Sequence, residues 1–136
     1  MKLFKQPAFW FILSASAVIM IMWGGTTSDT KSISRFFFLR FNRSDLVMHY
    51  LQFAMLAWFL LRWLNTAQLI HRKMINKWIP FLVCFIIGGV NEIFQMRIPE
   101  RSGAFDDQIA NAMGALMVTF LYLHIKRKNS NNNNVN

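Results

Sequence analysis

Side chains suited to binding or proton transfer are concentrated between two long apolar runs, in the stretch from Asn91 to Gly114. This stretch holds four of the six acidic residues in the chain: Glu92, Glu100, Asp106 and Asp107. Carboxylates and amides can bind amines and hydroxyls, and a carboxylate can also accept or donate a proton. Keeping such groups beside apolar segments long enough to cross a membrane costs free energy, so we interpret the stretch as a candidate site. These residues do not name a substrate.

Polar residues repeat with helical spacing in three apolar segments, which places each set on one face of its helix. The sets are Asp45, His49 and Gln52; Glu92 and Gln95; and Asp107, Asn111 and Gly114. Ala110 and Gly114 are small residues four apart, a spacing that lets two helices pack closely in a membrane. Gly88, one turn before Glu92, predicts a second close approach.

Four apolar segments must position these side chains. The chain is 54% hydrophobic and only 15% charged, which is too little charge for the surface of a soluble domain of 136 residues. We predict an all-α fold, an integral membrane bundle of four transmembrane helices at about 8–23, 46–64, 77–95 and 107–124. Residues 1–125 form a single domain in this prediction, and the Asn-rich tail 126–136 is expected to be disordered. No small-x-small cleavage motif follows the first apolar run, so we expect a retained helix rather than a signal peptide.

The distribution of lysine and arginine predicts the orientation of the bundle. With both termini inside, nine of the fifteen basic residues lie on the inner side and six on the outer side, as the positive-inside rule favours. All six acidic residues then lie on the outer side. The start of the second span, the end of the third and the start of the fourth meet at that surface. We therefore predict a polar site at the outer face of the membrane.

Composition also argues against several classes of function. The net charge of +9 does not indicate nucleic-acid binding, because the basic residues lie between apolar runs and not along one surface. Cys84 is the only cysteine, which excludes an intrachain disulfide and a site with several cysteine ligands. We predict no cofactor and no metal, because the chain has no paired-histidine motif of the zinc-enzyme type. A variant with His49, Glu92 and Asp107 as nitrogen and oxygen ligands stays open.

The order of the motifs resembles a known family. The motifs are Asp45 with His49, Glu92-x-x-Gln95, Pro99-x-Arg101 and Asp107-x-x-x-Asn111-x-x-Gly114. Together they resemble the VanZ-like family of small membrane proteins over residues 44 to 120. The resemblance implies a four-helix membrane bundle in the cytoplasmic membrane of a bacterium and an association with low-level resistance to the glycopeptide teicoplanin. Leu46 stands where that family usually has lysine, and Glu100 where glycine is common, so charge and loop geometry differ there.

Three classes of function are consistent with these residues. The candidate site residues are Asp45, His49, Glu92, Gln95, Arg101, Asp107 and Asn111. The first class is a binding protein, in which Arg101 takes an anionic group of a lipid-linked precursor, a peptidoglycan peptide or a glycopeptide. The second is an intramembrane enzyme with His49 or Glu92 as general base, the histidine being oriented by Asp45 or Asp107. The third is a structural or partner subunit embedded in membrane lipids, of undetermined oligomeric state. Each side chain also has a plainer role open to it, as a helix cap, an ion pair or a hydrogen bond between helices.

Overall fold

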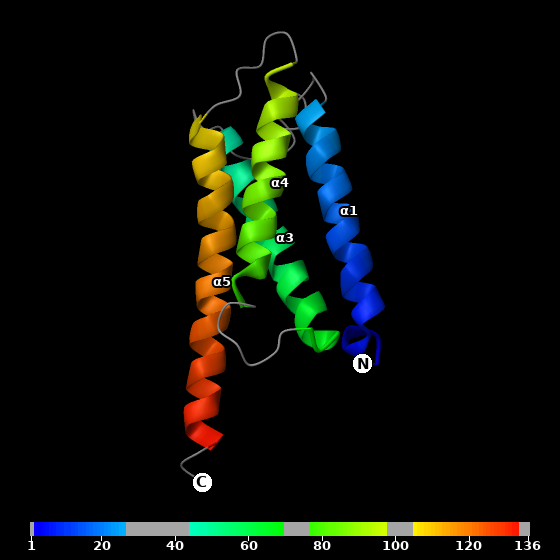
Figure 1. Ribbon diagram of the computed structural model, residues 1–136, viewed down its shortest axis with the longest axis vertical. Helices are drawn as coiled ribbons and strands as arrows, with labels where there is room; N and C mark the ends of the chain where they lie inside the picture. The colour runs from blue at the N-terminus through cyan, green and yellow to red at the C-terminus, as the bar shows by residue number, and fades with distance from the viewer. Residues whose placement is uncertain (1, 27–43, 70–76, 98–104, 134–136) are drawn as a thin grey trace.

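Four antiparallel α-helices form one bundle in the computed structural model of the chain (Figure 1). The structure describes residues 2–26, 44–69, 77–97 and 105–133. The helices are α1 (Pro7–Thr26), α3 (Ser44–Thr66), α4 (Ile79–Gln95) and α5 (Phe105–Asn133), and a 3-10 turn, η1 (Leu3–Lys5), precedes α1. The two chain termini lie toward the same end of the bundle. We call the opposite end, where α1 and α4 end and α3 and α5 begin, the site end.

Local sequence explains where the helices begin and end. Pro7 opens α1, and Pro80 lies in the first turn of α4, where a missing backbone N–H costs nothing. Acidic residues occupy the first turns of α3 and α5, where the positive end of the helix dipole favours them. After α3, Gln68 takes a left-handed backbone conformation with φ of 57°, which stops the helix.

The core lies between the helices and is built from small and aliphatic side chains. Its buried members are Ala17, Ile21, Phe53, Leu56, Ala57, Leu60, Cys84 and Ala115. The most extensive interface is between α3 and α5, followed by that between α1 and α3. Gly114 makes the first of these possible, since a Cβ atom there would run into the backbone carbonyl of Tyr50. The predicted close approach at Gly114 is confirmed.

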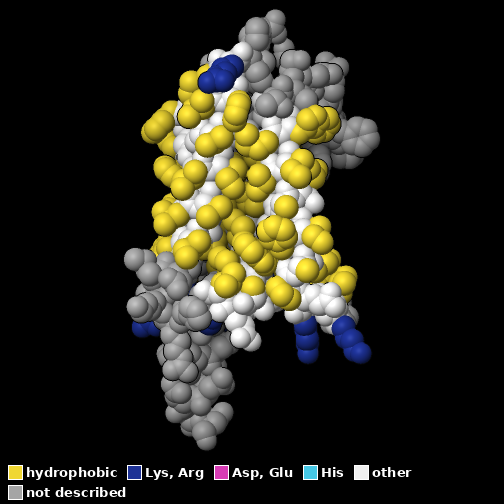
Figure 2. All heavy atoms as spheres, turned by 45° about the vertical axis from the view of Figure 1, so that its right-hand side comes forward, with side chains coloured by type: hydrophobic (Ala, Val, Ile, Leu, Met, Phe, Trp, Pro, Cys, Tyr) yellow, Lys and Arg dark blue, Asp and Glu magenta, His cyan; other side chains and the backbone are white. Residues whose placement is uncertain are grey.

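The outer surface of the bundle is apolar. Large hydrophobic side chains that face outward include Ile12, Ile19, Met20, Ile86 and Phe120, all more than 60% exposed. Figure 2 shows such side chains as a continuous band, with lysine and arginine at its two ends. Three helices are long and apolar enough to cross a membrane, over Pro7–Gly25, Asp45–Thr66 and Phe105–Lys128. The protein is therefore a multi-pass membrane protein.

Two helices differ from the spans predicted from the sequence. α4 begins at Ile79 rather than at residue 77, and its 17 residues make a shorter apolar helix than the other three. Such a helix is about 26 Å long, somewhat less than the roughly 30 Å hydrocarbon core. Its crossing of the membrane, like the placement of both termini inside, stays a prediction.

The end of α5 also differs from expectation. The tail was predicted to be disordered from residue 126, whereas α5 continues through Asn133. Adding residues to an existing helix needs no new nucleation, which explains how a polar sequence can extend it. Residues 134–136 lie outside the described part of the chain.

Candidate functional site

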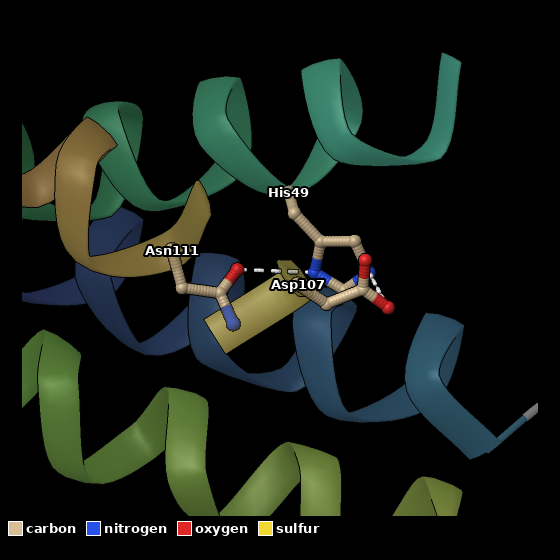
Figure 3. Close-up of polar contacts among 3 residues, drawn as sticks. All are labelled: His49, Asp107 and Asn111. Carbon is tan, nitrogen blue, oxygen red and sulfur yellow. Dashed lines mark hydrogen bonds and ion pairs between the residues drawn. The ribbon is translucent and has the colours of Figure 1, made fainter. Parts of the chain in front are cut away.

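His49 lies between two polar side chains of α5 (Figure 3). Its Nδ1 atom is 3.0 Å from Oδ1 of Asn111, and its Nε2 atom is 3.7 Å from Oδ2 of Asp107. Asn111 is fully buried and Asp107 is 8% exposed. With the amide oxygen of Asn111 as acceptor, Nδ1 carries the hydrogen, and Nε2 is the ring nitrogen directed at the carboxylate.

Glu92 of α4 lies close to His49 and Asp107. Its side chain is 5% exposed, and one of its carboxylate oxygens lies within 4.8 Å of ligand atoms of both His49 and Asp107. Three helices that are distant in sequence thus each contribute one ionisable group to a single buried cluster. We call His49, Glu92, Asp107 and Asn111 the polar cluster.

Gly88 lets α5 approach α4 directly beneath this cluster. A Cβ atom at Gly88 would lie 2.7 Å from Oε1 of Gln108 and 3.2 Å from Nδ2 of Asn111. The predicted close approach at Gly88 is therefore also confirmed. Within the described part of the chain, neither of these two buried polar atoms has a hydrogen-bond partner. Both remain available to a bound molecule or to water.

The other candidate residues are placed differently. Gln95 is buried on α4, one turn beyond Glu92. Asp45 is exposed in the first turn of α3, one turn before His49. Arg101 lies outside the described residues, so the anion-binding role expected for it stays a prediction.

Two buried polar residues near the cluster were not among the candidates. Asn91 is 1% exposed and contacts α1, where a Cβ atom on Gly25 would collide with its side chain. Gln108 donates from Nε2 to the backbone oxygen of Phe85 over 3.1 Å. The signal for Asn91 is its spacing, since it lies three residues after Gly88 and seven after Cys84, on the buried face of α4.

A groove runs along the outside of α3 and α5, behind the polar cluster. It encloses about 380 Å³ and is lined by Leu46, Val47, Tyr50, Asp106, Ile109, Ala110 and Met113. Most of its walls are apolar, and Asp106, at the start of α5, is its one carboxylate. Tyr50 and Asp106 are the chain neighbours of His49 and Asp107, so groove and cluster share the same helical turns.

The arrangement has three chemical capacities. The carboxylates and amides can bind amines or hydroxyls. An imidazole between an amide and a carboxylate can act as an oriented base. Among the residues that the structure describes, His49, Glu92 and Asp107 also form a group that can hold a metal ion.

Comparison with known proteins decides the family. The sequence model of the VanZ/LLP1 family matches residues 6–127, which include all four residues of the polar cluster. The chain belongs to the VanZ/LLP1 family. This confirms the resemblance drawn from the motifs and extends it to α1. No curated protein and no solved structure is detectably similar to this VanZ/LLP1 chain.

Proposed function

We propose that this VanZ/LLP1 protein binds a lipid-linked molecule of the cell envelope at the site end of its bundle. The observation that carries the proposal is the polar cluster, in which three helices direct buried ionisable side chains to one point inside an apolar bundle. Buried charges in a membrane are costly and are usually functional. Packing alone would be served better by apolar side chains at these positions.

The groove supports a ligand with an apolar part. It opens on the outward surface of α3 and α5, where lipid chains surround the bundle. A chain lying in this groove brings its polar head to the level of Asp106, beside the first turns of α3 and α5. Amine or hydroxyl groups of that head then meet the carboxylates and amides of the cluster. Arg101 is the proposed partner of an anionic group on the same head.

The proposed setting is the outer face of the bacterial cytoplasmic membrane, with both termini inside. The distribution of basic residues supports this orientation. There the protein would protect cells against a glycopeptide such as teicoplanin by holding the envelope molecule on which the drug acts. The resemblance to VanZ-like proteins supports that role.

Complementation of a deletion strain tests this function. Cells are given the wild-type chain, Glu92→Gln or Asn65→Ala, and teicoplanin tolerance is measured at matched protein levels. Asn65 is a polar control in the last turn of α3, where its Oδ1 accepts a hydrogen bond of 2.9 Å from the hydroxyl of Tyr122. We expect wild type and Asn65→Ala to restore tolerance and Glu92→Gln to fail. Full protection by Glu92→Gln would contradict the proposal. A further variant, Arg101→Ala, tests the role of that arginine, and full protection by it would contradict that role.

An intramembrane acid/base enzyme is the second candidate, and the His49–Asp107 contact favours it. In this account Nε2 of His49 takes a proton from a hydroxyl or water on the ligand. Asn111 orients the ring through Nδ1, and Asp107 stabilises the charged ring. The lipid and cell-wall extracts of the same cells distinguish the two functions. An enzyme changes the mass of an envelope component in wild-type cells but not in His49→Ala cells, whereas a binding protein leaves all masses unchanged.

A further inference from the structure

The three ionisable groups of the polar cluster are of types that ligate metal ions. His49 comes from α3, Glu92 from α4 and Asp107 from α5, and their ligand atoms all lie within 4.8 Å of one another. Each is held by a separate helix of a packed bundle, and the two carboxylates are at most 8% exposed. The position of the three groups is therefore fixed by the fold and does not depend on loops.

The orientation of the imidazole suits a metal ligand. Asn111 Oδ1, 3.0 Å away, accepts the hydrogen of Nδ1 and leaves Nε2 directed into the cluster. A neutral ring in this tautomer points its lone pair at the carboxylate of Asp107, 3.7 Å away. A cation held between the two groups would attract both of them. Metal-binding histidines typically make this same bond from the other ring nitrogen, which fixes the ring for the ion.

Distance and charge agree with a divalent ion. Two ligand atoms at zinc distances in a tetrahedral site are about 3.4 Å apart, close to the 3.7 Å between His49 and Asp107. The third ligand, at up to 4.8 Å, reaches the same ion through a side-chain shift of up to about 1.4 Å. Two carboxylates and one neutral imidazole are ligands of the types that bind divalent zinc. The mixed nitrogen and oxygen set favours Zn²⁺ over Mg²⁺, which prefers oxygen ligands.

We propose that His49, Glu92 and Asp107 bind one Zn²⁺ ion, with Asn111 as the residue that positions His49. Three protein ligands leave a coordination position for an oxygen of a bound molecule, as in catalytic zinc sites. The ion would thus hold a phosphate, carboxylate or hydroxyl oxygen of the envelope molecule. The zinc site itself stands without that ligand, so it can fail or succeed separately from the proposed function. The alternative source of positive charge beside the two carboxylates is a protonated His49 or an arginine of the chain.

Metal content of the purified protein tests the proposal. The chain is purified in detergent without a polyhistidine tag, stripped with a chelator and equilibrated with Zn²⁺ or Mg²⁺ in parallel. Bound metal is measured by mass spectrometry, and affinity by titration calorimetry. We expect one Zn²⁺ per chain, a higher Tm with Zn²⁺ and no comparable uptake of Mg²⁺. A wild-type protein that retains no stoichiometric Zn²⁺, or that prefers Mg²⁺, overturns the proposal without any variant.

Variants then assign the ligands. His49→Ala, Glu92→Gln and Asp107→Asn should each lose Zn²⁺ binding, while His124→Ala, at an exposed position of α5, should bind as wild type does. Asn111→Ala should weaken Zn²⁺ binding by about 10- to 100-fold, and Asn111→Asp, which keeps an acceptor oxygen, should restore most of it. Unchanged Zn²⁺ affinity in the three ligand variants, or an equal loss in the His124→Ala control, contradicts the assignment. Elution on gel filtration separates these results from misfolding.

Discussion

At the scale of single residues, the central feature is an imidazole buried between an amide and a carboxylate. Asn111 is fully buried, so its side chain is present for contacts inside the bundle and not for solubility. The His49–Asn111 bond joins α3 to α5, 62 positions apart in the chain. Removing either partner leaves a buried polar group without its bond, which costs more than the bond itself contributes.

Asn111→Ala should lower the free energy of unfolding by about 1–3 kcal/mol, because it leaves Nδ1 of His49 without its acceptor. Thr119→Val is the matched control, since Thr119 is also buried on α5 and donates a hydrogen bond of 2.9 Å to the backbone oxygen of Ala115 in its own helix. We expect the control to cost less than about 1 kcal/mol. Denaturation in detergent micelles measures both, and a larger loss for Thr119→Val would contradict this account.

At the scale of helices, α3 and α5 form the unit that holds the site. They share the most extensive interface, and on it His49 meets Asp107 and Asn111. Close packing at Gly114 sets how near these side chains can come. On the outside of the same two helices lies the groove.

Gly114→Ala should separate α3 from α5, because the added methyl group meets the backbone of Tyr50, which cannot rotate away as a side chain could. Overpacking of this kind costs about 1–3 kcal/mol and should also weaken any ligand or Zn²⁺ binding at the polar cluster. Gly89→Ala is the control, since nothing lies within 4 Å of an added Cβ atom there. Thermal unfolding compares the two; equal Tm values would show that the contact at Gly114 does not limit the interface.

Ala110→Phe should fill the groove and reduce retention of lipid by the purified protein, with little effect on the polar cluster. Ala110 lines the groove, and a phenyl ring occupies a substantial part of its 380 Å³. Leu121→Phe provides a similar change on an exposed part of α5 that does not line the groove. Native mass spectrometry of both proteins reads bound lipid directly. If Ala110→Phe binds as much lipid as the wild-type protein, the groove does not bind the lipid chain.

At the scale of the whole molecule, the polar cluster lies near one end of an apolar bundle whose termini lie toward the other (Figure 1). The function proposed here requires the site end to face outward. Cys84 is fully buried, so we expect the wild-type chain not to react with a maleimide. Labelling then reports on introduced cysteines.

Phe105→Cys and Lys128→Cys place one thiol toward each end of α5, both at exposed positions. With the site end outside, a membrane-impermeant maleimide should label residue 105 in intact cells and residue 128 only after permeabilisation. Labelling in the reverse order would contradict the orientation predicted by the positive-inside rule.

The sequence predicted much of this molecule, because long apolar runs locate membrane helices directly. For example, α3 was expected at about 46–64 and spans Ser44–Thr66. Helical spacing indicated which faces are polar, but it does not fix the rotation and crossing of neighbouring helices. Helical spacing therefore does not predict that Nδ1 of His49 bonds Asn111 while Nε2 faces Asp107. The groove was also not predicted, because its walls are ordinary apolar residues of two separate helices.

Native mass spectrometry of the protein purified with its own envelope lipids tests the central claim most directly. Wild-type chain and Asn65→Ala should each carry a ligand heavier than an ordinary phospholipid. Glu92→Gln, which keeps the shape of the side chain but not its charge, should lose that ligand while retaining ordinary phospholipids. Equal amounts of the same ligand on Glu92→Gln and wild type would contradict the claim that the polar cluster of α3, α4 and α5 is the binding site.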